Sequence, residues 1–201
     1  MTWKPKDLRQ IPTATGPLEI EVWSLAPHGN GNRLSDLAYL QHIRSGVAKV
    51  VSPTGRPEDS LQAGRYFAGL PKFADALTNL VAAELQDVQP DAILELPSTR
   101  DFNAPYTSAI QERFPTAVNL TGAISRCGQV KSGQSDSFDD ILADTVGNSP
   151  LDLSNVKTLV IIDDVFGKGK TVGAAVSRLR ELGLPADARV ALAVPLVVVG
   201  V

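Results

Sequence analysis

The chain of 201 residues has one cysteine, Cys127, and two histidines, His28 and His42. A single cysteine excludes an intrachain disulfide, and it also excludes a structural zinc site built on several thiolates. None of these three residues stands in a recognisable nucleophile motif. A thiol enzyme or a hydrolase is therefore a weak hypothesis.

The sequence also lacks a strong charge of either sign and a long apolar run. Nineteen basic and 22 acidic residues leave a net charge of −3, so we expect neither a nucleic-acid partner nor a membrane partner. The longest apolar run, residues 191–201, is much shorter than the roughly 20 residues of a membrane helix and indicates a buried strand. The first residues have no apolar centre typical of a secretory signal. We expect a cytoplasmic protein.

The composition that is present is typical of a folded globular chain, with 43% hydrophobic and 20% charged residues, which argues against wholesale disorder. The length suits one compact domain. Within it we predict an N-terminal hood, or variable segment, over residues 1–60 and an α/β core over residues 61–201.

Apolar periodicity predicts the elements of that core. Strands are expected at 18–23, 92–96, 117–124, 156–165 and 188–199, and helices at 34–45, 73–85, 103–114 and from Thr171 to Leu182. Pro71 is expected to begin the second helix, and residues 52–60 and 127–150 to be loops. The fold class is therefore α/β, a mainly parallel twisted sheet with helices on both faces.

The strongest candidate site follows the apolar run 158–162. Asp163 and Asp164 end this strand, and a turn with Gly167 and Gly169 leads into the next helix. Glycines let backbone amides approach an anion, the helix N-terminus adds partial positive charge, and carboxylates accept hydrogen bonds from ribose hydroxyls. Taken alone, the acid pair could be merely solvated and the turn merely a turn. Together they predict a site for a ribose 5-phosphate.

The same turn resembles the end of a nucleotide-binding P-loop but does not match it. Gly169-Lys170-Thr171 fits the last three positions of that pattern, whereas its first glycine would fall on Asp164. A carboxylate there would face the phosphates, so we reject a P-loop ATPase or kinase.

A second candidate segment follows the strand at 92–96. Ligands of open α/β sheets bind beyond the carboxyl ends of the strands. We therefore include the four residues of this loop in the site: Pro97, Ser98, Thr99 and Arg100.

Residues 159–171, LVIIDDVFGKGKT, resemble the 5-phosphoribosyl-1-pyrophosphate (PRPP) motif of type I phosphoribosyltransferases. The order of elements over residues 73–199 is also similar to the core of that family. A weaker similarity, carried by residues 96–100 and 126–134, extends to its competence-type (ComF-like) branch.

The resemblance implies roles for individual residues. Asp163 and Asp164 would hold the ribose 2- and 3-hydroxyls and are candidate ligands, at least indirectly, of Mg²⁺. The loop after residue 96 would lie at the pyrophosphate, residues 127–150 would match the mobile flap, and Lys131 or Arg100 would neutralise pyrophosphate. The 5-phosphate would be held by Gly167, Lys168, Gly169, Lys170 and Thr171.

The implied reaction is attack of a nitrogen nucleophile on the ribose C1 of PRPP, with release of pyrophosphate and with Asp163, Asp164 and Arg100 as catalytic residues. Two departures from the family matter. Gly167 stands where hypoxanthine–guanine enzymes have an aspartate, which argues against that subclass, and Lys168 replaces a common threonine. The alternative is a non-catalytic PRPP or nucleotide sensor on the same fold. A homodimer would be typical of the family, and the acceptor base is not specified by the sequence.

Overall fold

The computed structural model describes residues 5–28, 57–86, 88–97, 103–128, 137–148 and 152–198, with only the backbone for 26–28, 57–69 and 198. The predicted helix 34–45 lies outside these residues, as do Ser98, Thr99, Arg100 and Lys131.

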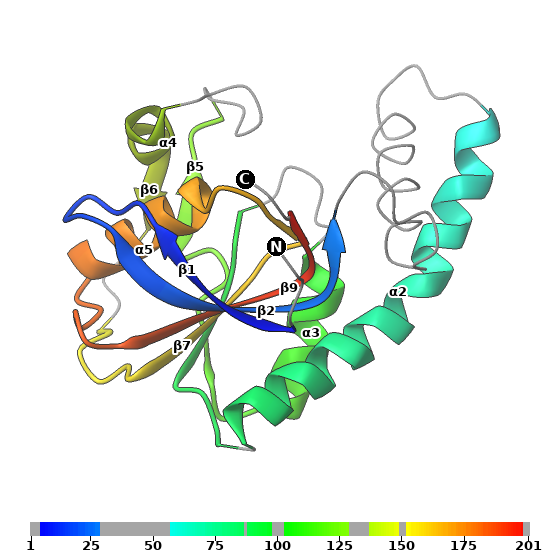
Figure 1. Cartoon of the computed structure of the whole chain (residues 1–201), viewed down its shortest axis with the longest axis horizontal. Coiled ribbons are helices and arrows are strands. Elements are labelled where there is room, and N and C mark those ends of the chain that lie inside the picture. Colours follow the sequence, from blue (N-terminus) through cyan, green and yellow to red (C-terminus); the bar gives the residue numbers. More distant parts are fainter. Residues whose placement is uncertain are drawn as a thin grey trace.

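A seven-stranded sheet forms the centre of the protein (Figure 1). Its order is β1-β2-β9-β7-β3-β4, and the short β8 also pairs with β9. All pairings are parallel except that of β1 with β2. This confirms the predicted mainly parallel sheet. The strands are β1 (Lys6–Ile11), β2 (Leu18–His28), β3 (Ala92–Glu95), β4 (Val118–Asn119), β7 (Thr158–Ile162), β8 (Val165–Phe166) and β9 (Arg189–Val198).

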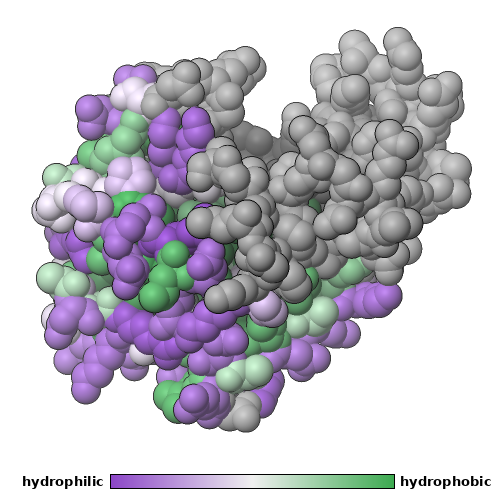
Figure 2. Space-filling model, viewed as in Figure 1, coloured by the Kyte–Doolittle hydropathy of each residue, from purple (hydrophilic) through white to green (hydrophobic). Residues whose placement is uncertain are grey.

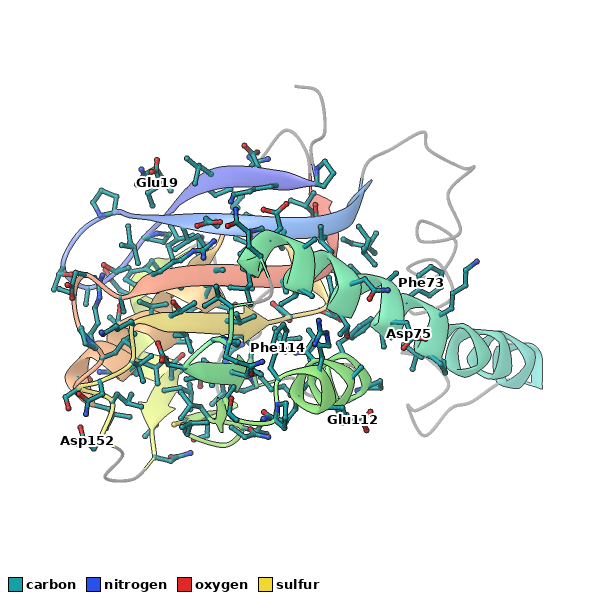
Figure 3. The ribbon with its side chains drawn as sticks, turned by 90° about the horizontal axis from the view of Figure 1, so that it is seen from below. Glu19, Phe73, Asp75, Glu112, Phe114 and Asp152 are labelled. Atoms are coloured by element: carbon teal, nitrogen blue, oxygen red, sulfur yellow. The ribbon has the colours of Figure 1, made fainter. Side chains whose placement is uncertain are left out.

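Helices cover both faces of the sheet, as predicted. Successive side chains of a strand point to opposite faces. Thus Val160 and Ile162 pack with α2 (Pro57–Leu85) and α3 (Ala104–Arg113), whereas Leu159 and Ile161 pack with α5 (Lys170–Glu181). Figure 3 shows α2 and α3 on one side of the sheet. The central strands are apolar on both faces because both faces are covered.

Helix α2 is longer than the sequence pattern predicts. It begins at Pro57 and contains Pro71 in its interior, so the predictions that Pro71 begins the helix and that residues 57–60 are a loop are wrong. A proline inside a helix leaves one carbonyl without its partner. Pro71 itself is exposed, and the helix continues through it to Leu85.

A small unit lies between β4 and β7. Strands β5 (Ile124–Arg126) and β6 (Thr145–Gly147) form an antiparallel pair, joined through α4 (Phe138–Asp144). The predicted strand 117–124 is therefore divided: a turn at residues 120–123, with Gly122 at a φ of 84°, separates β4 from β5. The prediction that residues 127–150 form a polar loop is wrong for α4 and β6.

The N-terminal strands belong to the central sheet. Strand β2 pairs with β9 from Glu21 with Ala191 to His28 with Val198. Ile20 and Val22 are buried on one face of the sheet and Trp23 on the other. The predicted boundary at residue 60 falls inside α2. The hood predicted over residues 1–60 stays a prediction, and residues 29–56 of it lie outside the described residues.

The surface of the described residues mixes polar and apolar side chains, as Figure 2 shows for one face. The large exposed hydrophobic side chains come from separate segments: Leu8, Val88, Val118 and Val146. Among the described helices, none combines the length and the apolar character needed to span a bilayer.

Candidate functional site

The connections that leave the neighbouring strands β3 and β7 run in opposite directions across the sheet. These neighbouring parallel strands continue to opposite sides: β3 leads through α3 to β4, and β7 leads through α5 to β9. The two helices lie on opposite faces (Figure 1). The carboxyl ends of β3 and β7 therefore form a topological switch point, the usual ligand position of open α/β sheets.

The acid pair lies at this switch point. Asp163 and Asp164 stand between β7 and β8, and both of these strands pair with β9. The backbone N–H of Asp163 donates to the carbonyl of Ala193 at 3.3 Å. Because pairing with β9 holds the backbone on both sides, the two carboxylates have a fixed place beyond the end of β7.

The Asp163 carboxyl group lies deep in the fold, although the residue keeps partial solvent exposure. Its Oδ1 accepts hydrogen bonds from the backbone N–H of Asp164 at 2.9 Å and from Nδ2 of Asn103 at 3.3 Å. Burial raises the pKa of Asp163, and the neighbouring charge of Asp164 raises it further, while the two hydrogen bonds oppose the shift. The net shift is well above the ordinary range of an aspartate.

The structure adds Asn103, which the sequence analysis missed. This residue precedes α3 and has no solvent exposure. Its Nδ2 donates to the carbonyl of Leu96 at 3.1 Å as well as to Asp163, so one side chain links the ends of β3 and β7. An asparagine before a predicted helix ordinarily indicates an N-cap, so no local pattern could have indicated this contact across the sheet.

The turn before α5 has the geometry expected of an anion site. Gly169 precedes α5 at a φ of 71°, and a Cβ at this position would stand 2.5 Å from Cγ2 of Ile11. Glycine is therefore required here, both by the backbone conformation and by the close contact. No side chain caps the helix at Gly169. A helix start of this kind directs backbone N–H groups and the positive end of the helix dipole toward an anion.

The other predicted phosphate-binding residues lie around this turn. Lys168 is exposed, whereas Gly167, Lys170 and Thr171 are partly buried. Pro97 follows β3 and is also partly buried. The structure therefore places the described residues of both predicted segments at the carboxyl ends of β7 and β3.

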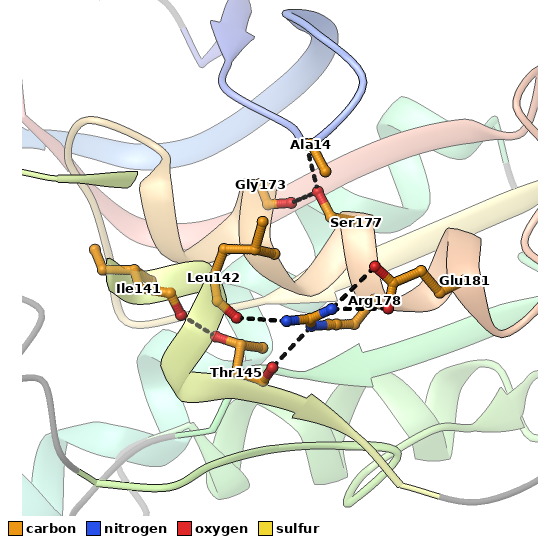
Figure 4. Close-up of polar contacts among 8 residues, drawn as sticks. All are labelled: Ala14, Ile141, Leu142, Thr145, Gly173, Ser177, Arg178 and Glu181. Atoms are coloured by element: carbon orange, nitrogen blue, oxygen red, sulfur yellow. Dashed lines mark hydrogen bonds and ion pairs between the residues drawn. The ribbon is translucent and has the colours of Figure 1, made fainter. Parts of the chain in front are cut away.

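The turn between β1 and β2 packs against α5 beside this site. The backbone N–H of Ala14 donates to Oγ of Ser177 at 3.0 Å (Figure 4). A Cβ on Gly173 would overlap the carbonyl oxygen of Pro12. The absence of a side chain at Gly173 thus permits a backbone from the opposite end of the sequence to approach the first turns of α5.

Arg178 joins the small unit to α5. Its Nε donates to the carbonyl of Thr145 and one terminal nitrogen to the carbonyl of Leu142, both at 2.8 Å, and the other terminal nitrogen pairs with Glu181 (Figure 4). The end of α4 and the start of β6 are therefore attached to the helix that follows the candidate site. These residues belong to the segment that the sequence resemblance assigns to the flap.

The donor set suits a metal ion held mainly by a substrate. No group of three or more His, Cys, Asp and Glu side chains converges within the described residues. Mg²⁺ commonly uses one or two protein carboxylates and completes its coordination with water and substrate phosphate oxygens. Asp163 and Asp164 fit that requirement.

Comparison with solved structures finds matches that include two phosphoribosyltransferases. An adenine phosphoribosyltransferase matches with a TM-score of 0.47 and 13% identity, covering 96% of this chain and 85% of that chain. A hypoxanthine phosphoribosyltransferase from Staphylococcus aureus matches with a TM-score of 0.38 and 14% identity, covering 63% of this chain and 62% of that chain. A scan against protein-family models and a search of curated proteins find no match. Similarities of this size do not establish membership of a family.

Proposed function

We propose that the protein binds PRPP with Mg²⁺ and transfers its phosphoribosyl group to a nitrogen acceptor, releasing pyrophosphate. The observation that carries this proposal is the position of two adjacent carboxylates at the switch point, next to a glycine turn that opens a helix without a side-chain cap. The carboxylates suit the ribose hydroxyls, and the turn suits the 5-phosphate.

Each part of the site has a distinct task in this proposal. The backbone around Gly167 and Gly169 holds the phosphate, and Asp163 and Asp164 accept hydrogen bonds from the ribose hydroxyls. Both anchors fix the orientation of ribose C1 toward the acceptor, and such positioning supplies a large part of the rate in group transfer. The ionised carboxylate of this pair also places negative charge near the ring, which stabilises the positive charge that develops there in the transition state.

The loop that follows Pro97 is proposed to face the pyrophosphate, because it leaves the neighbouring strand β3 at the same edge of the sheet. Mg²⁺ bound to the substrate would neutralise charge on the leaving pyrophosphate. Asp163 and Asp164 are the residues proposed to hold it, directly or through water.

The test is isothermal titration of the purified protein with PRPP and Mg²⁺. We expect the double variant Asp163→Asn, Asp164→Asn to bind at least about 100-fold more weakly, since two charge-assisted hydrogen bonds to the ribose are lost. The matched control is Asp75→Asn, Asp187→Asn, which removes the same charge from two exposed residues outside the candidate site. Unchanged affinity in the Asp163, Asp164 variant would refute the assignment of the site.

Turnover separates transfer from binding alone. We expect pyrophosphate to appear when PRPP, Mg²⁺ and the correct acceptor from a panel of nucleobases are added to the wild-type protein. Tight PRPP binding without pyrophosphate release across the panel would contradict the transfer reaction while leaving the binding site in place.

A further inference from the structure

We propose that Asn103 is a third member of the sugar site: its Nδ2 positions the Asp163 carboxylate, and its Oδ1 accepts a hydrogen bond from a hydroxyl group of the bound sugar. This inference rests on the proposed function, because it assumes that the ligand is a phosphorylated sugar.

The first observation is a buried acceptor that lacks a partner. Asn103 has no solvent exposure. Its Nδ2 donates hydrogen bonds to the carbonyl of Leu96 and to Oδ1 of Asp163. Within the described part of the chain, Oδ1 of Asn103 has no hydrogen-bond partner. Buried polar atoms of native proteins are nearly always satisfied, so an exception beside a candidate site calls for a donor.

The orientation of this amide is determined by its neighbours. The carbonyl oxygen of Leu96 can only accept a hydrogen bond, and Oδ1 of Asp163 already accepts one from the backbone of Asp164. A reversed amide would therefore direct its oxygen at two acceptors, which is unfavourable. The amide nitrogen must therefore face the ends of β3 and β7. Oδ1 is left without a hydrogen-bond donor among the described residues.

Helix capping does not account for the residue. Asn103 makes no side-chain cap bond to α3. Instead its backbone carbonyl accepts from the N–H groups of Tyr106 and Thr107 at 3.0 Å and from the Thr107 hydroxyl at 3.2 Å. These contacts hold the backbone at the start of α3, so the carboxamide has a fixed position next to the acid pair.

The chemistry of an amide oxygen defines the missing group. Oδ1 of Asn103 belongs to the same amide as Nδ2, which lies 3.3 Å from Oδ1 of Asp163. As an oxygen acceptor it repels a phosphate and attracts a hydroxyl. The glycine turn before α5, unlike Asn103, offers backbone N–H groups, which suit a phosphate. A sugar hydroxyl therefore suits Asn103, while the phosphate suits the turn.

The experiment compares two probes, ribose 5-phosphate and inorganic phosphate, titrated into the full chain without metal. We expect Asn103→Ala to weaken ribose 5-phosphate about tenfold, the loss of one well-formed hydrogen bond, and to leave phosphate affinity within about twofold of wild type. Asn103→Leu keeps the approximate size of the side chain but has neither the amide donor nor the oxygen acceptor, and we expect the same selective loss. Thermal unfolding verifies that each variant is folded.

Thr107→Ala is the matched control, because it removes a buried contact to the backbone of Asn103 without touching Asp163. Equal weakening of both probes, or the same selective loss in Thr107→Ala, would show a merely structural role and overturn the inference. Wild-type affinity for ribose 5-phosphate in both Asn103 variants would overturn it while the proposed function stands. If the wild-type protein binds ribose 5-phosphate no more tightly than inorganic phosphate, both this inference and the proposed function are overturned.

Discussion

At the residue scale, Glu21 is the centre of a cluster of ionic contacts. Its carboxylate accepts from Arg189 at 2.8 and 3.0 Å, from Lys6 at 2.7 Å and from the indole N–H of Trp23 at 3.2 Å. The hydrogen bonds from Arg189 are the largest cause that lowers the pKa of Glu21 to about 2. The cluster joins β1, β2 and the start of β9.

The shift has a defined consequence for stability. The pKa of Glu21 is lower in the folded protein than its ordinary value of 4.5, so its ionised form favours folding. This stabilisation is complete above about pH 4.5 and is lost as the pH falls toward about 2. We expect Glu21→Gln to lower the free energy of unfolding by about 1 kcal/mol at pH 7, after allowance for solvent screening of a partly exposed cluster.

Urea unfolding of wild type and Glu21→Gln between pH 2 and pH 7 provides the measurement. The difference in the free energy of unfolding between wild type and Glu21→Gln should decrease steadily below about pH 4.5. Glu19→Gln is the control, since it removes an exposed carboxylate from the same strand. A difference that stays constant down to pH 2 would contradict the role given to the Glu21 ion pairs.

At the scale of elements, one arginine determines how the small unit meets α5. Arg178 donates to carbonyls at the end of α4 and the start of β6, where helix carbonyls lack partners within the helix. Its bond to Glu181 is on the exposed side of α5. The two carbonyl contacts therefore contribute more to stability than the surface ion pair.

We expect Arg178→Ala to lower the free energy of unfolding by about 2–3 kcal/mol, because two charge-assisted hydrogen bonds are lost together. Glu181→Ala removes only the ion pair and should cost about 0.5 kcal/mol or less. Hydrogen exchange should accelerate in α4 and β6 of Arg178→Ala and stay unchanged in β7 and β9. Equal effects of the two substitutions would contradict the anchoring role.

At the scale of the whole molecule, the N-terminal strands complete both sides of the core. Ile11, Ile20 and Val22 are buried with α5, and Trp23 is buried with α2 and α3. Removal of such side chains costs about 1–5 kcal/mol each, and the stability of a domain is about 5–15 kcal/mol in total. The core therefore depends on strands that precede β7 and β9 by more than 100 residues.

We expect the fragment 57–201 to lack a cooperative thermal transition and to bind a hydrophobic dye, because β9 would lose its partner β2. Addition of a peptide of residues 5–28 should restore part of the transition. A fragment that unfolds cooperatively with the stability of the full chain would contradict this dependence and would support a separate N-terminal segment.

The sequence by itself determined the parts of the protein that depend on local pattern. The apolar runs predicted β3, β7 and β9, the amphipathic pattern predicted α5 and residues 73–85 of α2, and together they predicted the α/β class. The acid pair and the glycine turn were also recognisable, because the strand end, the carboxylates and the helix start are adjacent in the chain. Local order is visible in sequence whenever the interacting residues are neighbours.

The tertiary structure alone decided what depends on distant contacts. Helix α2 continues through the exposed Pro71, β2 joins the sheet beside β9, and β1 pairs with β2. Asn103 meets Asp163 across 60 positions of sequence, and Arg178 meets Thr145 across 33. Contacts of this kind leave no periodic signal, because hydrophobic pattern specifies which face of an element is buried but not which residue it meets there.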